Sequence, residues 1–179
     1  MGRRIYQLRI SLDGVAPPVW RLVQVPGAYT LDRVHRVIQY AMGWQNYHLH
    51  SFDIAGTAYG EPDPDDDLDL VDEMEVRLDA VTARGTRLRY TYDYGDWWEH
   101  TVEVEDVLAA DPDERYPVCL DGSGACPPED VGGVFGYAEV VAALGDAGHP
   151  EHAAIRERFG AAVETFDPRL ATTLLRRLA

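Results

Sequence analysis

Alternation of apolar and polar side chains is the feature that most constrains what this chain can fold into. Every second residue from Tyr6 to Leu12 is apolar, and the residues between them are polar. Successive side chains of a β-strand point to opposite faces, so this period of two predicts a strand with one buried face. After a turn, VWRLVQV (19–25) predicts a second strand, antiparallel to the first.

A β-hairpin is predicted around TYDYGDWWEH (91–100), because alternation continues on both sides of this stretch. Opposed residues of antiparallel strands share a face, which here requires a loop with an odd number of residues. We therefore predict the three-residue loop 95–97, with Gly95 at positive φ. This register places Asp93 opposite Glu99, which indicates either a splayed, solvated tip or a site that uses two carboxylates together. It pairs Tyr94 with Trp98, Tyr92 with His100, Tyr90 with Val102, Leu88 with Val104, Arg89 with Glu103 and Arg87 with Glu105.

One helix is predicted early in the chain, where Thr30 can act as N-cap and apolar residues recur at helical spacing up to Gly43. HLHSFDI (48–54) alternates again and predicts a third strand, paired with a short strand near Tyr59. Residues 115–137 are rich in Pro, Gly and Asp and predict a loop. Further helices are predicted at about 137–145, 150–159 and 168–178.

The order of these elements, strands first and helices last, predicts the fold class α+β. The expected architecture is a mainly antiparallel β-sheet with one early helix and a helical C-terminal third, about residues 137–178, packed against it. We expect a single domain that spans residues 1–179.

The charge of the chain argues against one class of function. The formal net charge is −15 at pH 7. Nucleic-acid binders usually carry a basic face, so direct nucleic-acid binding is not expected. No apolar run approaches the ~20 residues of a membrane span, and the start of the chain lacks the apolar core of a signal peptide. A cytoplasmic protein without membrane association is therefore expected.

Acidic side chains are concentrated in residues 61–75, where EPDPDDDLDLVDEME holds nine carboxylates and two prolines. We interpret this segment as a flexible, solvated acidic loop. The alternative is a calcium loop, because aspartates alternate within it. The glycine and the glutamate that an EF-hand loop places at its sixth and twelfth positions are absent, however.

Three histidines, His48, His50 and His100, fall on apolar strand faces, where a buried polar ring is costly unless it is satisfied. They indicate either satisfied core histidines or a pocket lined by imidazoles, with or without a metal. No recognised metal-binding spacing such as H-E-x-x-H is present. Cys119 and Cys126 are separated by six residues, unlike a zinc knuckle, and are expected to be reduced thiols. The sequence therefore identifies no cofactor.

Five motifs follow one another along the chain: APPVWR (16–21), TLDRVHRVIQYAMGW (30–44), HLHSF (48–52), YDYGDWWEH (92–100) and YPVCLDGSGACPPEDVGGVFGY (116–137). Together they resemble the plasmid pRiA4b ORF-3-like proteins, a family also labelled TnpR-like, for passenger proteins of insertion elements. The resemblance covers most of the chain and implies an α+β fold and a plasmid or mobile-element association, but no particular activity.

The TnpR-like label raises the question of DNA resolvase activity. A serine resolvase begins with a strand that ends in Tyr-x-Arg-x-Ser, whose serine attacks a DNA phosphate. RIYQLRIS offers only Arg9 and Ser11, which are also simply the polar face of a strand, and Tyr6 stands one position too far. With no basic DNA-binding tail, resolvase activity is not expected.

The leading functional hypothesis is a non-enzymatic binding module that takes a protein, a peptide or a small ligand in an aromatic and histidine-lined cleft. The second is a hydrolase, with or without a metal, in which the three histidines act as base or ligand beside carboxylates. The third is an accessory protein of a mobile element that acts through protein contacts. The candidate pocket residues are Trp44, His48, His50, Tyr92, Asp93, Asp96, Trp98, His100, Glu129, Asp130 and Tyr137, and the candidate metal ligands are His48, His50 and His100.

Overall fold

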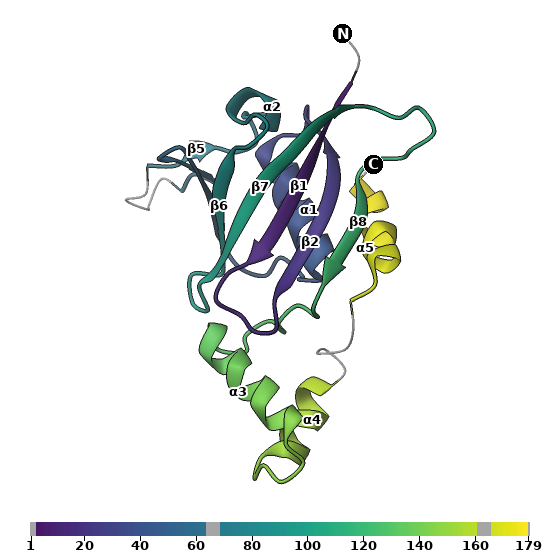
Figure 1. Cartoon of the computed structure of the whole chain (residues 1–179). Coiled ribbons are helices and arrows are strands. Elements are labelled where there is room, and N and C mark those ends of the chain that lie inside the picture. The colour runs from purple at the N-terminus through teal and green to yellow at the C-terminus, as the bar shows by residue number, and fades with distance from the viewer. Residues whose placement is uncertain (1–2, 64–68, 161–165, 179) are drawn as a thin grey trace.

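An eight-stranded β-sheet carries the fold (Figure 1). The computed structural model describes residues 3–63, 69–160 and 166–178. The strands are β1 (Arg4–Leu12), β2 (Val19–Pro26), β3 (His50–Ile54), β4 (Thr57–Gly60), β5 (Val71–Asp72), β6 (Arg87–Tyr92), β7 (Trp98–Ala109) and β8 (Val118–Ser123). The helices are α1 (Leu31–Met42), α2 (Leu78–Val81), α3 (Gly133–Gly145), α4 (His152–Phe159) and α5 (Pro168–Leu175), followed by the 3-10 turn η2 (Arg176–Leu178).

The order across the sheet is β5-β4-β3-β6-β7-β1-β2-β8. Neighbouring strands are antiparallel, except that β4 and β5 are parallel. The predicted pairing of the first two strands is confirmed, with Leu8 opposite Val23. The predicted alternation is confirmed too, because Leu8 and Ile10 are fully buried while Arg9 is partly exposed. The third predicted strand is β3, which places Phe52 opposite Tyr59.

Helix α1 covers the buried face of the sheet (Figure 1). It follows Thr30 and ends at Gly43, whose φ of 102° is a left-handed conformation that glycine adopts without strain. Val34, Val37 and Ile38 are at most 1% exposed and belong to the same hydrophobic core as the inner faces of the strands. The predicted early helix is therefore confirmed, and it places its polar edge beside β3.

The hairpin between β6 and β7 has a longer loop than the sequence predicted. Tyr92 lies opposite Trp98, so the register is shifted by two residues and the loop contains five residues. Asp93 leaves the strand because its Oδ1 accepts the N–H of Gly95 at 2.8 Å. Positive φ angles fall on Asp93 (60°) and Trp97 (56°), so the expectation of positive φ at Gly95 is wrong.

The same shift changes the charged pairs on the outer face. Arg87, not Arg89, lies opposite Glu103, and its guanidinium contacts that carboxylate at 2.9 Å. Thr91 lies opposite Glu99, so the predicted like-charge pair across the strands does not form. A shift of two residues preserves which side chains point inward, because the side-chain period of a strand is also two.

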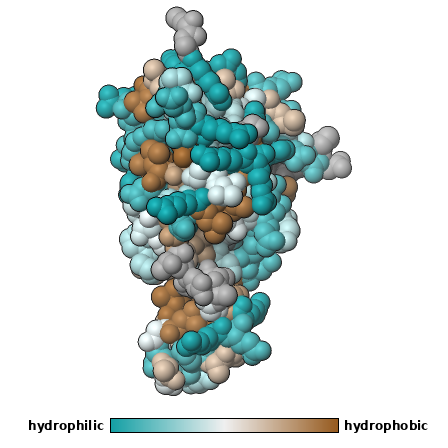
Figure 2. All heavy atoms as spheres, turned by 90° about the vertical axis from the view of Figure 1, so that its right-hand side faces the viewer, coloured by the Kyte–Doolittle hydropathy of each residue, from teal (hydrophilic) through white to brown (hydrophobic). Residues whose placement is uncertain are grey.

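The expectation of a helical C-terminal third packed against the sheet is wrong. The edge strand β8 forms within residues 115–137, which the sequence predicted as a loop, and the helices α3, α4 and α5 that follow it are short and separate. α3 packs chiefly against α4, and the two project beyond the end of the sheet (Figures 1 and 2). Only α5 packs against β8 and α1. Among the described residues, no helix is long and apolar enough to cross a membrane.

The burial of these elements gives the physical reason for the difference. α4 has no buried residue, so it offers no apolar face to place on the sheet. α5, in contrast, buries Ala171 and Leu175. The sequence VCLDGS of β8 does not alternate and lies in a segment rich in Pro, Gly and Asp, and only its pairing with β2 makes it a strand.

The acidic segment 61–75 is partly structured. It includes β5, which pairs with β4, and Glu73, which is only 5% exposed. The predicted flexible loop and its calcium-binding alternative fall partly on residues 64–68, which lie outside the described residues. The described part of this segment brings carboxylates next to α1.

Candidate functional site

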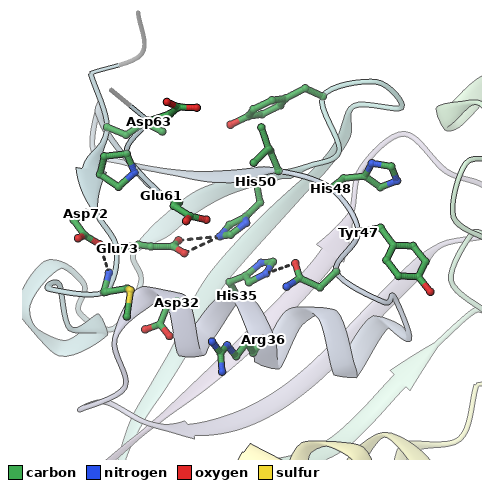
Figure 3. Close-up of a pocket in the computed structure, with 16 residues that line it drawn as sticks. Asp32, His35, Arg36, Tyr47, His48, His50, Glu61, Asp63, Asp72 and Glu73 are labelled. Atoms are coloured by element: carbon green, nitrogen blue, oxygen red, sulfur yellow. Dashed lines mark hydrogen bonds and ion pairs between the residues drawn. The ribbon is translucent and has the colours of Figure 1, made fainter. Parts of the chain in front are cut away.

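A cleft of about 890 Å³ lies between α1, the segment leading into β3, and the acidic segment around β5 (Figure 3). Tyr47, Leu49 and Met74 line it and are more than 60% exposed, so the cleft also presents apolar surface. The charged and imidazole side chains that line it are Asp32, His35, Arg36, His48, His50, Glu61, Asp63, Asp72 and Glu73. Five carboxylates and a single arginine thus belong to its described lining.

Two stacked histidines form the floor of the cleft. The rings of His35 on α1 and His50 on β3 lie 3.4 Å apart and are nearly parallel, with an angle of 5° between their planes. Nε2 of His50 also lies 2.9 and 3.1 Å from the two carboxylate oxygens of Glu73 (Figure 3). Glu73 is only 5% exposed, and the imidazole of His50 is the partner that its buried carboxylate requires.

His35 is held neutral by its surroundings. Burial, and then the neighbouring His50, lower the pKa of His35 to about 3. Its Nε2 lies 2.7 Å from Oδ1 of Asn46, an oxygen that only accepts, so Nε2 carries the hydrogen. Its Nδ1 then accepts the hydroxyl hydrogen of Tyr90 at 2.8 Å. Each nitrogen of the ring thus has a defined partner, which fixes the ring under His50.

A second cluster joins an imidazole to two carboxylates. Nε2 of His48 lies 3.1 Å from Oδ1 of Asp130 and 3.6 Å from Oδ2 of Asp93. The carboxylate of Asp93 is 7% exposed and that of Asp130 is 70% exposed. The ring of His48 points away from His50, so the two histidines serve different clusters (Figure 3). Three of the predicted site residues, from three separate motifs, therefore meet here.

Hydrogen bonds hold together the loops that carry this cluster. Oε1 of Glu129 accepts the N–H of Gln45 at 2.8 Å and the hydroxyl of Tyr92 at 3.1 Å. Oδ2 of Asp96, in the hairpin loop, accepts the N–H of Gly132 at 3.0 Å. The segment that bears Asp130 is thereby fastened on both sides, as expected for loop carboxylates.

The remaining predicted pocket residues are buried and do not line the cleft. Trp98 and His100 are fully buried, and Nε1 of Trp98 and Nε2 of His100 have no hydrogen-bond partner among the described residues. Trp44 packs against both of them and donates Nε1–H to the carbonyl of Pro127 at 3.0 Å. Tyr92, Trp44 and Tyr137 are at most 5% exposed. Of these, Tyr92 lies next to His48, with ring centroids 5.9 Å apart, and Trp44 packs against Tyr92.

Comparison with known proteins places the chain in a family. The sequence profile described as plasmid pRiA4b ORF-3-like protein matches residues 4–173. The chain belongs to this family. The uncharacterized protein y4hQ of Sinorhizobium fredii is 41% identical over 162 residues, which cover 89% of this chain and 83% of that protein. A crystal structure of a protein of unknown function from Methanosarcina mazei Go1 is similar, with a TM-score of 0.87 and 34% identity over 94% of this chain and 98% of that one.

Sequence reasoning missed several residues of the cleft in this pRiA4b ORF-3-like protein. His35 lies on the apolar stripe of α1, four residues after Leu31 and three before Ile38, and a polar residue at such a position is a usable signal. Glu73 carried no such signal, because it stands among eight other carboxylates of the acidic segment.

Stability is expected to fall in mild acid because two buried histidines stay neutral in the folded state. Burial lowers the pKa of His100 to about 4, and that of His35 is about 3. The unfolded chain titrates these rings near pH 6.5 and binds more protons, so the free energy of unfolding should fall as pH drops from about 6.5 to 4. Between pH 7 and 5 each ring should contribute a loss of about 2 kcal/mol.

Urea unfolding at several pH values, with wild type and His100→Phe compared, checks this expectation. The phenylalanine fills a similar volume and removes one titrating ring, so the variant should lose about half of the histidine contribution to the slope. An unchanged slope in His100→Phe would show that His100 binds protons in the folded protein as it does in the unfolded chain, which would contradict a lowered pKa.

Proposed function

We propose that this pRiA4b ORF-3-like protein is a non-enzymatic binding module whose cleft takes a positively charged segment of a partner protein. The observation that carries the proposal is the charge of the cleft, which has five carboxylates and one arginine in its described lining. Complementary charge raises the rate of encounter and excludes partners of the wrong sign.

The apolar residues of the cleft support a peptide rather than a small ion as the ligand. Tyr47, Leu49 and Met74 are exposed by 65%, 63% and 67% and line the same cleft. Tyrosine and methionine are frequent in binding surfaces, where they bury apolar area against a partner. A segment that alternates arginines with aliphatic side chains satisfies both the carboxylates and this apolar surface.

The stacked floor keeps the cleft in shape. Glu73 is already paired with His50, which rests on His35. Glu61 is exposed, and Asp32 and Asp72 are partly exposed, so these carboxylates are accessible to the ligand. A floor that does not need to reorganise lowers the entropic cost of binding.

Calorimetric titration with a ten-residue peptide that carries four arginines and three leucines tests the proposal. Saturable binding is expected, weakening with added salt, while the same peptide with glutamate in place of arginine should not bind. Free arginine amide should bind far more weakly than the peptide. Equal binding of arginine amide would contradict a peptide as the ligand.

Charge variants locate the binding surface. Glu61→Lys should weaken peptide binding by about tenfold or more, and Arg36→Gln should strengthen it. Glu157→Lys is the matched control, because it makes the same change of charge at an exposed position on α4, outside the cleft. If Glu157→Lys weakened binding as much as Glu61→Lys, the total charge of the protein rather than the cleft would be responsible.

A hydrolase is the second candidate, and one observation favours it. Nε2 of His48 lies 3.1 Å from Oδ1 of Asp130, which places an imidazole and a carboxylate side by side as candidate general acid and base. His100 is fully buried and is thereby removed from contact with a substrate. Turnover of p-nitrophenyl acetate or p-nitrophenyl phosphate that is lost in His48→Ala would establish this function. Activity that survives in His48→Ala would rule out this pair as its source.

A further inference from the structure

We infer that His48, Asp93 and Asp130 form a binding site for a divalent first-row transition-metal ion. The three side chains come from the segment before β3, the hairpin loop and the loop before α3. One nitrogen of His48 and one carboxylate oxygen from each aspartate lie within 4.8 Å of one another. Of the three, only His48 also lines the cleft, while Asp93 and Asp130 lie outside its lining, so the inference does not depend on the peptide-binding proposal.

The state of the His48 ring is the first argument for an ion. Its Nε2 is buried and makes no hydrogen bond with any described residue, although Oδ1 of Asp130 is only 3.1 Å away. The two atoms are within hydrogen-bond distance but lack hydrogen-bond geometry. Buried polar nitrogens rarely lack a partner, so we expect Nε2 of His48 to bind an ion in the space between the two carboxylates.

The distances are the second argument. Two donor atoms bound about 2.1 Å from one ion lie about 3.0 Å apart at a right angle and about 3.4 Å apart at the tetrahedral angle. The nitrogen of His48 lies 3.1 Å from Asp130 and 3.6 Å from Asp93. Both separations are close to those of ligands that share an ion.

The loops are held in place for this arrangement before any ion binds. The N–H of Asp93 donates to the carbonyl of Leu49 at 2.9 Å, and its Oδ1 accepts from Gly95, which leaves Oδ2 facing His48. On the other side, Glu129, the residue next to Asp130, accepts the N–H of Gln45 and so anchors this loop. Ligands positioned by further hydrogen bonds raise the affinity of a metal site.

The donor set indicates which ions fit. One imidazole and two carboxylates supply two negative charges, which a divalent cation neutralises. Imidazole favours Zn²⁺, Co²⁺ or Ni²⁺ over Ca²⁺ and Mg²⁺, which prefer oxygen ligands. Three protein ligands leave further positions on the ion for water or another ligand.

Titration of untagged, chelator-treated full-length protein with Co²⁺ and Zn²⁺ tests the inference. One ion should bind per chain, Co²⁺ should give a visible absorption band, Zn²⁺ should displace it, and Zn²⁺ should raise the melting temperature. His48→Ala, Asp93→Asn and Asp130→Asn should each lower the affinity by about 100-fold. The two asparagine variants tolerate positive φ as aspartate does, so they are expected to fold, which circular dichroism checks.

His149→Ala is the control, because it removes a histidine of the α3–α4 region that is not part of the cluster. Its affinity for Co²⁺ should equal that of wild type. Failure of the folded wild-type protein to bind either ion at millimolar concentration would overturn the inference and leave His48 as an ion-pair partner of the two aspartates. Binding that is unchanged in His48→Ala would also overturn it.

Discussion

Trp98→Ala should lower the free energy of unfolding by about 3–5 kcal/mol, because it removes a large aromatic side chain from the interior. Trp98 is fully buried and lies next to Trp44, with ring centroids 6.0 Å apart. The neighbouring Trp97 is 55% exposed and provides a matched control. Trp97→Ala should cost less than about 1 kcal/mol.

Urea unfolding monitored by circular dichroism measures both variants on one scale. Trp97→Gly adds a check on the loop, because glycine adopts the φ of 56° at this position more readily than tryptophan does. Equal losses in Trp98→Ala and Trp97→Ala would mean that the hairpin does not bury the face assigned to it.

Arg21→Ala should also be strongly destabilising, by about 3–5 kcal/mol. Arg21 is 1% exposed and donates hydrogen bonds to the carbonyls of Ala41, Trp20 and Ser123 at 2.8, 2.8 and 2.9 Å. The ring of Phe166 lies 3.7 Å from its guanidinium carbon. One side chain thus joins the end of α1, β2 and the edge strand β8, and its removal leaves three carbonyls without this donor.

Arg21→Lys separates the effect of charge from that of shape. Lysine keeps the charge but cannot reproduce the planar fork that reaches several carbonyls, so this variant should recover only a minor part of the stability. Arg87→Ala, at a side chain 70% exposed, is the control and should cost less than about 1 kcal/mol. A loss for Arg21→Ala as small as that for Arg87→Ala would show that the guanidinium does not hold β8 in place.

The candidate site could be predicted only in part. The motifs drew attention to His48, Asp93 and Asp130, and the structure brings these three together. The same reasoning grouped them with Trp98 and His100, which are in the core. A strand pattern shows which side chains face inward, but inward-facing residues include both pocket walls and core, and the distinction depends on what packs over them.

The sequence by itself determined which faces are buried and where the early helix begins and ends. Periods of 2 and 3.6 residues are local properties, and Gly43 ends α1 through its own backbone freedom. Only the tertiary structure decided the hairpin register, the addition of β8 to the sheet and the meeting of His48, Asp93 and Asp130. Each depends on contacts between distant segments, such as the hydrogen bond from Asp93 to Leu49 and the pairing of β8 with β2. A register shift of two leaves every face unchanged, so alternation carries no information about it.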